Sequence, residues 1–437
     1  MTSSVHILGV LLTVALLLAV SWLSGRNVRD ARSFMTGGTS GTWMVGDALL
    51  GTMAGGQSTI GTAQLAFCYG LSAWWFTLGA AIGCLLLGYA YAGPLRRSGC
   101  TTLLVFFGGI RSAGVSGLVK LILLYFSSLA AGAIVWHIGG GIDGLRSGVE
   151  TIYQSDTLSR IGSLPDIGGI HHRYGSLVAR GVMKDLGGCL SLVLGVVSTQ
   201  TYAQCIWSAS TTRHARRGAL ICAFSLPLIG AACTLVGIYM RGHYITADEW
   251  AAMQQAGETL SDGIGIIENS AQAFPAFILG HLPSWLGGIM LGTLLINILG
   301  CGSGLSLGAA TILVRDVYGN LTRKASQWSQ LAETRLSIVI ILVVAVVCAM
   351  MWNNSFINDL GFLSLGLRAV SILFPLSLAL WMPKRFAASR ILTAMPVGVA
   401  AMLAAKTLSM PGDAVYYGLA VELSYILIPT GKKAAKQ

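Results

Sequence analysis

The feature that most constrains the fold of this chain is a series of eleven long apolar stretches. Each approaches the ~20 residues that an α-helix needs to cross the hydrocarbon core of a bilayer. Helices are the expected form, because a backbone surrounded by lipid must satisfy its hydrogen bonds within each segment. The predicted spans lie near residues 5–24, 44–66, 71–95, 116–138, 186–207, 218–240, 275–312, 336–352, 360–382, 391–406 and 413–430. They predict an all-α polytopic membrane protein.

The composition supports a single membrane domain. The 437 residues are 54% hydrophobic and 10% charged, whereas soluble domains carry about 25% charged residues. No separable soluble domain is visible, so we expect one transmembrane domain over residues 1–437, with extracytoplasmic loops at 141–185 and 241–274. The net charge of +11 is concentrated in particular loops, which indicates membrane topology and no nucleic-acid partner.

Basic residues recur in every second loop. They follow the first, third, fifth, seventh, ninth and last stretches, as Arg26, Arg29 and Arg32; Arg96, Arg97 and Arg111; Arg213, Arg216 and Arg217; Arg315, Arg323, Lys324 and Arg335; Lys384, Arg385 and Arg390; and Lys432, Lys433 and Lys436. Cytoplasmic loops attract Lys and Arg. We therefore expect the N-terminus outside and the C-terminus inside.

Catalytic and metal-binding patterns are missing from the sequence. Nine cysteines are scattered through it without a CxxC pair in a zinc or redox context, so we infer neither a disulfide framework nor a metal site. The predicted spans contain no H-x-E and no Ser/His/Asp constellation. His171 and His172 lie in the outer loop and are better explained as solvated residues. We expect no catalytic residue, no resident cofactor and no enzyme.

Three spans carry polar residues and glycines where lipid-facing helices have no use for them. The second contains four glycines and Gln57 between Gly51 and Gly61. The fifth contains Gln200 and Gln204, which share a helical face. The seventh is rich in glycine and serine from Asn297 to Gly308. Transporters bind solutes where helices are interrupted, but close packing through small residues explains the glycines about as well.

Arg368 and Glu422 lie inside predicted spans. Intramembrane charges are functional hypotheses by default, but for these two we favour a structural role.

Three segments resemble the sodium/solute symporter family, which has the LeuT-type inverted-repeat fold. The first runs from Gly51 to Phe76 and includes YGLSAWW at 69–75. The second runs from Thr199 to Gln204 and is followed by RHARRGA at 213–219. The third and most specific is ATILVRDVY at 310–318. The order and spacing of the three are preserved over most of the chain.

The resemblance implies two sites. Backbone carbonyls at Gly51, Ala54 and Asn297 correspond to sodium ligands, and Gln57, Ser58 and Gln200 correspond to residues that face the substrate, with Gln204 on the same face as Gln200. The hydroxyl pair of the family's sodium site is replaced by Gly300 and Cys301. A thiol is a poor ligand for a hard cation, so protons, a relocated sodium ion or uncoupled transport are alternatives. Ser303 could substitute only in a shifted register.

The chain is also shorter than the family pattern, which usually has two more spans. Residues 114–125 resemble the start of the family's sixth helix, yet they follow almost directly on residues 106–109, which resemble the loop after the third. Alternatively, 116–138 is the fourth helix and the next two are missing.

Together these observations predict a secondary active transporter that moves a small polar organic solute by alternating access. We expect a monomer in the lipid bilayer of a prokaryotic cytoplasmic membrane, with Na⁺ or H⁺ as the coupling ion. The alternative is a non-transporting relative, either inactive or sensory. No signalling domain is visible in the loops or tails, which argues against a sensor.

Overall fold

The computed structural model describes residues 3–25, 40–97, 110–162, 170–261, 263–313, 327–351, 356–382 and 385–428. Its first half comprises α1 Ser4–Gly25, α3 Thr42–Met53, η1 Gln57–Gly61, α4 Thr62–Tyr69, η2 Gly70–Trp74, α5 Trp75–Leu86, η3 Leu87–Tyr91, α6 Ala92–Arg97, α7 Ile110–Ile138, α8 Gly141–Ile152, α9 Asp156–Gly162, α10 Ile170–Gly175, α11 Val182–Ser198 and α12 Gln200–Ser208. Its second half comprises α13 Thr212–Arg241, β1 Tyr244–Thr246, α14 Ala247–Gln255, β2 Gly265–Ile267, η4 Ser270–Gln272, α15 Ala273–His281, α16 Ser284–Ile312, α18 Gln327–Met351, α19 Ile357–Trp381, α20 Ala388–Thr407 and α21 Ala414–Leu427.

Every predicted span coincides with a helix or an interrupted helix. The second corresponds to α3, η1 and α4, the third to α5, η3 and α6, and the fifth to α11 and α12. By length and apolar composition, six helices of the described residues could cross a membrane, and the bent pair α11 and α12 would make a seventh. Shorter apolar helices lie at Ser4–Leu16, Leu336–Met351 and Ala414–Leu427. The chain is therefore an integral membrane protein built from helices.

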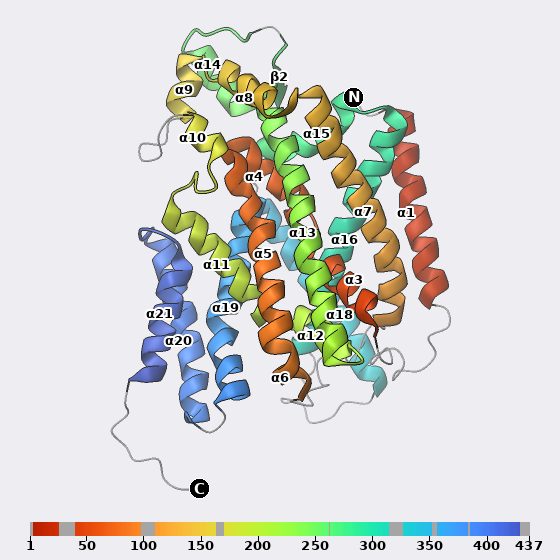
Figure 1. Ribbon diagram of the computed structural model, residues 1–437, viewed down its shortest axis with the longest axis vertical. Helices are drawn as coiled ribbons and strands as arrows, with labels where there is room; N and C mark the ends of the chain where they lie inside the picture. The colour runs from red at the N-terminus through yellow and green to blue at the C-terminus, as the bar shows by residue number, and fades with distance from the viewer. Residues whose placement is uncertain are drawn as a thin grey trace.

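The short helices of the predicted outer loops and the basic end of α6 lie at opposite ends of the bundle (Figure 1). In Figure 1 α8, α9, α14 and β2 lie at the top, at the same end as the start of α1, and α21 lies in the lower half. Helix α6, whose last turn carries Arg96 and Arg97, and α12 lie toward the lower end. The basic loops predicted around Arg26, Arg315 and Lys432 lie outside the described residues.

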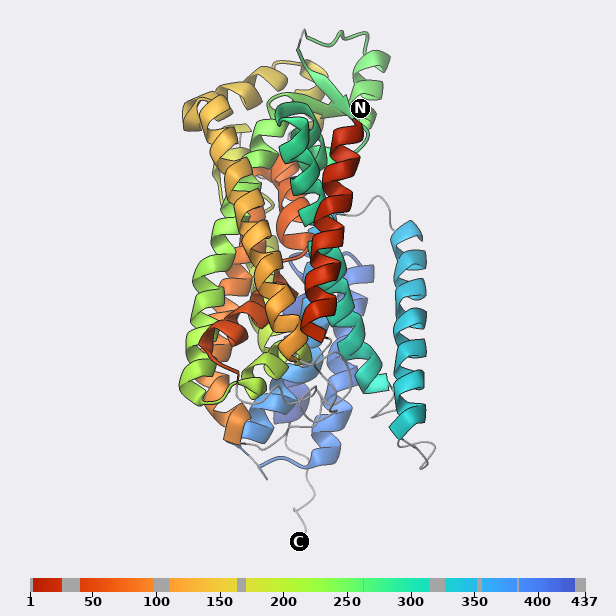
Figure 2. The same cartoon turned by 90° about the vertical axis from the view of Figure 1, so that its right-hand side faces the viewer.

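Helix α13 lies between α5 and α7 at the front of the bundle in Figure 1, and Figure 2 shows it along one side. Three of its glycines allow neighbouring helices to approach closely: Gly218 meets Val45 of α3, Gly230 meets Thr77 of α5, and Gly237 meets Ala63 and Ala66 of α4. In a bilayer, where apolar side chains gain little by leaving lipid, such close van der Waals packing is a main force between helices. Helix α13 therefore packs closely against three neighbouring helices through small residues.

Helix α18 shows the opposite surface. Figure 2 places it at the side of the bundle, at some distance from most other helices. Its apolar side chains are exposed on several faces, with Val339, Val343 and Val346 each more than half exposed. An exposed helix of this composition is suited to lipid and not to water.

The described part of the predicted outer loop 141–185 forms a cap of short helices, α8, α9 and α10. The phenol of Tyr174 donates to the Phe67 carbonyl at 2.9 Å, and Arg173 Nε donates to the Cys68 carbonyl at 2.8 Å. Gly70, with φ +59°, turns the chain from α4 into η2 directly beneath this cap. The cap thus covers the turn between the second and third predicted spans.

The structure also bears on the shortened length. Only residues 98–109 separate the end of α6 from the start of α7. A spanning helix needs ~20 residues, so this connection cannot contain even one additional span. Helix α7 packs against α1, α3, α13 and α16.

Candidate functional site

The second span is broken at its middle. Helix α3 ends at Met53, Ala54 leaves helical geometry with φ −82° and ψ 84°, and η1 begins at Gln57. Two hydroxyls satisfy the carbonyl that the break exposes: Ser58 Oγ donates to Gly55 O at 2.9 Å and Thr59 Oγ1 does so at 3.0 Å. Side chains of the same segment therefore satisfy the carbonyl that the break exposes.

The fifth span is broken as well. Helix α11 ends at Ser198 and α12 begins at Gln200, with a bend of 48° between them. Thr199 is extended at the break, with φ −89° and ψ 119°, and its hydroxyl donates to the Gly195 carbonyl at 2.7 Å. Helix α12 continues for nine residues beyond the break.

Both breaks lie against the same two helices, α16 and α19. At the first, a Cβ on Gly55 would lie 2.8 Å from Cys301 Cβ of α16, and Gln57 Nε2 lies close to Gly361 of α19. At the second, Thr199 accepts a hydrogen bond from Arg368 of α19. Helix α12, which follows this break, also packs against α16. Two interrupted spans thus converge on one region of the bundle.

The residues predicted for the ion site come together at the first break. Asn297 and Cys301 of α16 lie beside Gly55, next to Ala54. Cys301 Sγ donates to the Thr52 carbonyl at 2.9 Å. Asn297 is fully buried and its Oδ1 has no hydrogen-bond partner among the described residues. Gly51 lies in the last turn of α3, and the Ser303 side chain lies outside the described residues.

This donor set does not fit the sodium site that the resemblance implies. Sodium prefers oxygen ligands, and carbonyl oxygens are available at the break. However, Gly300 has no side chain and the Cys301 thiol acts as a hydrogen-bond donor to Thr52. The position of the hydroxyl pair therefore provides no side-chain oxygen.

The residues predicted to face the substrate lie at both breaks. Gln57 is half-buried against α19, and Ser58 is fully buried with its hydroxyl on Gly55. Gln200 opens α12, and its Nε2 is buried without a hydrogen-bond partner among the described residues. Gln204 is buried one turn further along. Their roles in binding stay predictions.

Two further polar residues were not identified from the sequence. Gln64 of α4 accepts a hydrogen bond from the backbone N–H of Ile357 at 3.0 Å, at the start of α19. Asn358 is fully buried beside Gly61, and neither of its amide atoms has a partner among the described residues. An amide inside an apolar span was the available signal for Gln64, but its contact with α19 depends on folding.

Arg96, in the last turn of α6, binds the segment that follows α12. Its guanidinium donates to the Ser210 carbonyl at 2.9 Å and to the Ala209 carbonyl, just after α12. Trp207 Nε1 donates in return to the Leu95 carbonyl at 3.0 Å. Backbone hydrogen bonds also join Ser40 to Ser208 and Ser210. These hydrogen bonds tie the end of the fifth span to the start of the second and to the end of the third.

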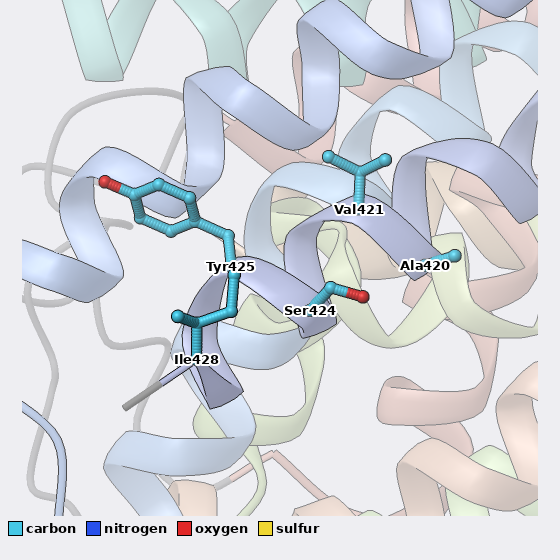
Figure 3. Close-up of a pocket in the computed structure, with 5 residues that line it drawn as sticks. All are labelled: Ala420, Val421, Ser424, Tyr425 and Ile428. Carbon is cyan, nitrogen blue, oxygen red and sulfur yellow. The ribbon is translucent and has the colours of Figure 1, made fainter. Parts of the chain in front are cut away.

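A shallow apolar depression lies elsewhere, on α21. Figure 3 shows its lining residues, Ala420, Val421, Ser424, Tyr425 and Ile428, all from one helix and its end. None of the predicted site residues contributes to it, and Ile428 is 59% exposed. Its surface is suited to contact with lipid and not to binding a polar solute.

Comparisons with known proteins agree with this architecture. The sequence profile of the Sodium:solute symporter family matches residues 98–398. Sodium/glucose cotransporter 1 of Oryctolagus cuniculus is 19% identical over 383 residues, and that of Sus scrofa is 20% identical, each alignment covering 72% of this chain. The chain spans 57% of the length of these relatives. A solved structure of a Na⁺-coupled sialic acid symporter superposes with a TM-score of 0.70 at 15% identity, covering 97% of this chain and 96% of that one.

Proposed function

Because the chain belongs to the sodium:solute symporter family, we propose that it is a secondary active transporter. It moves a small polar organic solute across the cytoplasmic membrane of a prokaryotic cell by alternating access. No observation on the described residues favours the alternative of an inactive or sensory relative. The solute binds where the two broken spans meet α16 and α19.

The convergence of the two breaks carries this proposal. A continuous membrane helix uses its backbone hydrogen bonds internally, whereas a broken one leaves N–H and C=O groups for a ligand. Breaks at Ala54 and Thr199 lie in one bundle, against the same partner helices. A purely structural bundle has no need for two of them.

The proposal assigns distinct roles to the predicted residues. Gln57 and Gln200 carry amides at the two breaks, and they supply donors and acceptors to a polar solute. Ser58 and Thr59 hold the first break in shape through Gly55. The residues at the usual sodium position do not reproduce its ligands, so we infer that sodium binding there is lost or weak, and that the coupling ion is a proton or a sodium ion held elsewhere.

The decisive test of transport is uptake by purified protein in proteoliposomes. A pool of sugars, amino acids and carboxylates is presented with sodium, proton or no gradient, and accumulated solutes are identified by mass spectrometry. We expect at least one solute to accumulate in protein-containing vesicles above protein-free ones. Equal contents under all gradients would contradict symport.

Substitution of Gln57 tests the location of the solute. Gln57→Ala removes the amide that would form hydrogen bonds with the bound solute. A polar group of the solute is then buried without a partner, which costs about 1–3 kcal/mol. We expect uptake to fall to background in this variant. Gln254→Ala is the matched control, because Gln254 is an exposed glutamine on α14. Wild-type uptake by Gln57→Ala would remove the first break from the solute site.

A further inference from the structure

Arg368 is a cation inside the protein at the second break. It lies near the middle of α19, eleven residues after its first residue Ile357. Its Nη1 donates to Thr199 Oγ1 at 3.3 Å and its Nη2 donates to Ser364 Oγ at 3.2 Å. Both partners are neutral hydroxyls, and both contacts are long for hydrogen bonds of a charged group.

Two arginines whose side chains are 3% and 2% exposed, Arg180 and Arg241, have carboxylate partners, whereas Arg96, half-buried as Arg368 is, donates to backbone carbonyls. Arg180 lies 2.7 Å from Asp185 and 2.8 Å from Asp359, and Arg241 lies 2.8 Å from Glu249. Among the described residues, no carboxylate lies within ion-pair distance of Arg368. A charge in the bilayer that keeps no counter-ion is costly, so a bundle that retains one is expected to use it.

The residues on either side of Thr199, the partner of Arg368, carry unused donors. Gln200 Nε2 is buried without a partner among the described residues, and so is the hydroxyl of Ser198, a residue that is 2% exposed. The nine-residue helix α12 begins at Gln200, and no side chain caps its N-terminus. The first N–H groups of a helix have no internal partner and carry a partial positive charge.

We propose that Arg368 is the binding residue for a carboxylate, and that the transported solute is a monoanion. The guanidinium meets the carboxylate in a bidentate pair, and the N-terminus of α12 with Ser198 and Gln200 supplies further donors. One guanidinium neutralises one negative charge. A dianion such as a phosphate ester would leave a net charge in the membrane interior, which is unfavourable.

This assignment rests on the proposed transport function and makes it more specific. The break at Thr199 provides the charged end of the site and the break at Ala54, with Gln57, provides the neutral polar end. A solute with one carboxylate and several hydroxyl or amide groups matches both ends. A neutral sugar would leave the Arg368 charge without a partner.

The test is thermal unfolding of the purified protein with matched pairs of solutes at millimolar concentration. Each pair contains a monocarboxylate and a neutral analogue: gluconate with glucose, galacturonate with galactose, lactate with lactamide, and acetylglycine with acetylglycinamide. A ligand that binds only the folded state raises its unfolding temperature. We expect stabilisation by at least one acid and not by its neutral partner. Stabilisation by neutral members alone, or by none, would overturn the assignment.

Variants at Arg368 separate binding from structure. Arg368→Gln should raise the Kd for the stabilising acid about 30-fold or more, the factor expected when a desolvated charge pair loses one member. Arg368→Lys keeps the charge but not the planar fork, so a smaller loss is expected. Arg385→Gln, at an exposed arginine, is the control and should bind as the wild type does.

The unfolding temperature of Arg368→Gln, measured without added solute, gives an independent readout. If Arg368 has no counter-ion, Arg368→Gln should fold and unfold at the same temperature as the wild type or higher. Failure of this variant to fold would show that the arginine is structural and would overturn the proposal. Gradient-driven uptake of neutral solutes that is unaffected by Arg368→Gln would leave transport standing while refuting the carboxylate site.

Discussion

Gly70 positions the outer cap against the bundle. Its φ of +59° lies in the left-handed region, and a Cβ there would lie 2.4 Å from the Tyr174 backbone. Gly70→Ala combines a strained backbone, which costs about 1–2 kcal/mol, with a clash against main-chain atoms. We expect a lower unfolding temperature in detergent, measured by intrinsic fluorescence.

Gly175→Ala is the control for this prediction, because a Cβ at Gly175 meets no atom within 4 Å. An unchanged unfolding temperature in Gly70→Ala would mean that the cap does not hold the turn as described.

Cys301 is the residue at which the ion site departs from the family pattern. Its thiol donates to the Thr52 carbonyl beside the first break. Cys301→Ser places an oxygen at this position, which suits a hard cation better than sulfur does. We expect the variant to gain sodium-dependent thermal stability or uptake relative to the wild type, with choline chloride as the ionic-strength control.

Cys301→Ala removes the sulfur without adding an oxygen and should show no such gain. Equal sodium dependence in the serine and alanine variants would show that the position does not take part in ion binding.

At the scale of elements, α13 and α14 are joined by a buried ion pair. Arg241 is 2% exposed and lies 2.8 Å from Glu249, and its guanidinium also lies over the rings of Phe67 and Tyr153. Burial disfavours ionisation of Glu249, but Arg241 and the hydrogen bond from the Thr246 backbone outweigh it, so the pKa of Glu249 is lowered from its usual value. Glu249→Gln leaves a buried charge unpaired, and we expect a loss of about 3 kcal/mol in unfolding free energy.

The pH dependence follows from the sign of this pKa shift. A carboxyl whose pKa is lower in the folded state stabilises the fold above its unfolded pKa, and that stability is lost as pH falls through the folded value. Wild-type unfolding temperature should therefore decrease below about pH 4.3, and the decrease should be smaller in Glu249→Gln. The exposed Glu268→Gln serves as the control; equal profiles in all three proteins would contradict the pairing.

The two breaks differ in how far the local sequence predicts them. The residues that break α3 and its continuation include glycines, which favour irregular backbone, so the position near Ala54 follows from the local sequence. The break at Thr199 has no glycine or proline. It is accompanied by the contact between Thr199 and Arg368, which joins residues 169 positions apart.

At the scale of the whole molecule, the orientation in the membrane is the testable property. The alternation of basic loops predicts a cytoplasmic C-terminus, and Figure 1 places α21, the last described helix, in the lower half, away from α14 and the start of α1. Green fluorescent protein fused after Gln437 should fluoresce, whereas alkaline phosphatase at the same position should be inactive. Alkaline phosphatase inserted at Gly257, in the outer loop, should be active. The reverse pattern would invert the topology and the sidedness of the proposed transport.

The sequence by itself determined the membrane environment, the eleven helical segments, the alternation of the loops and the family, because hydropathy and charge act over one span at a time. It also identified Gln57, Gln200 and Arg368 as polar groups in apolar surroundings. Only the tertiary structure decided that both breaks contact α16 and α19, that Cys301 turns its thiol to Thr52, and that Arg368 meets Thr199 and no described carboxylate. Those contacts join residues far apart in the chain, and their energies depend on distances of a few ångströms that no local pattern encodes.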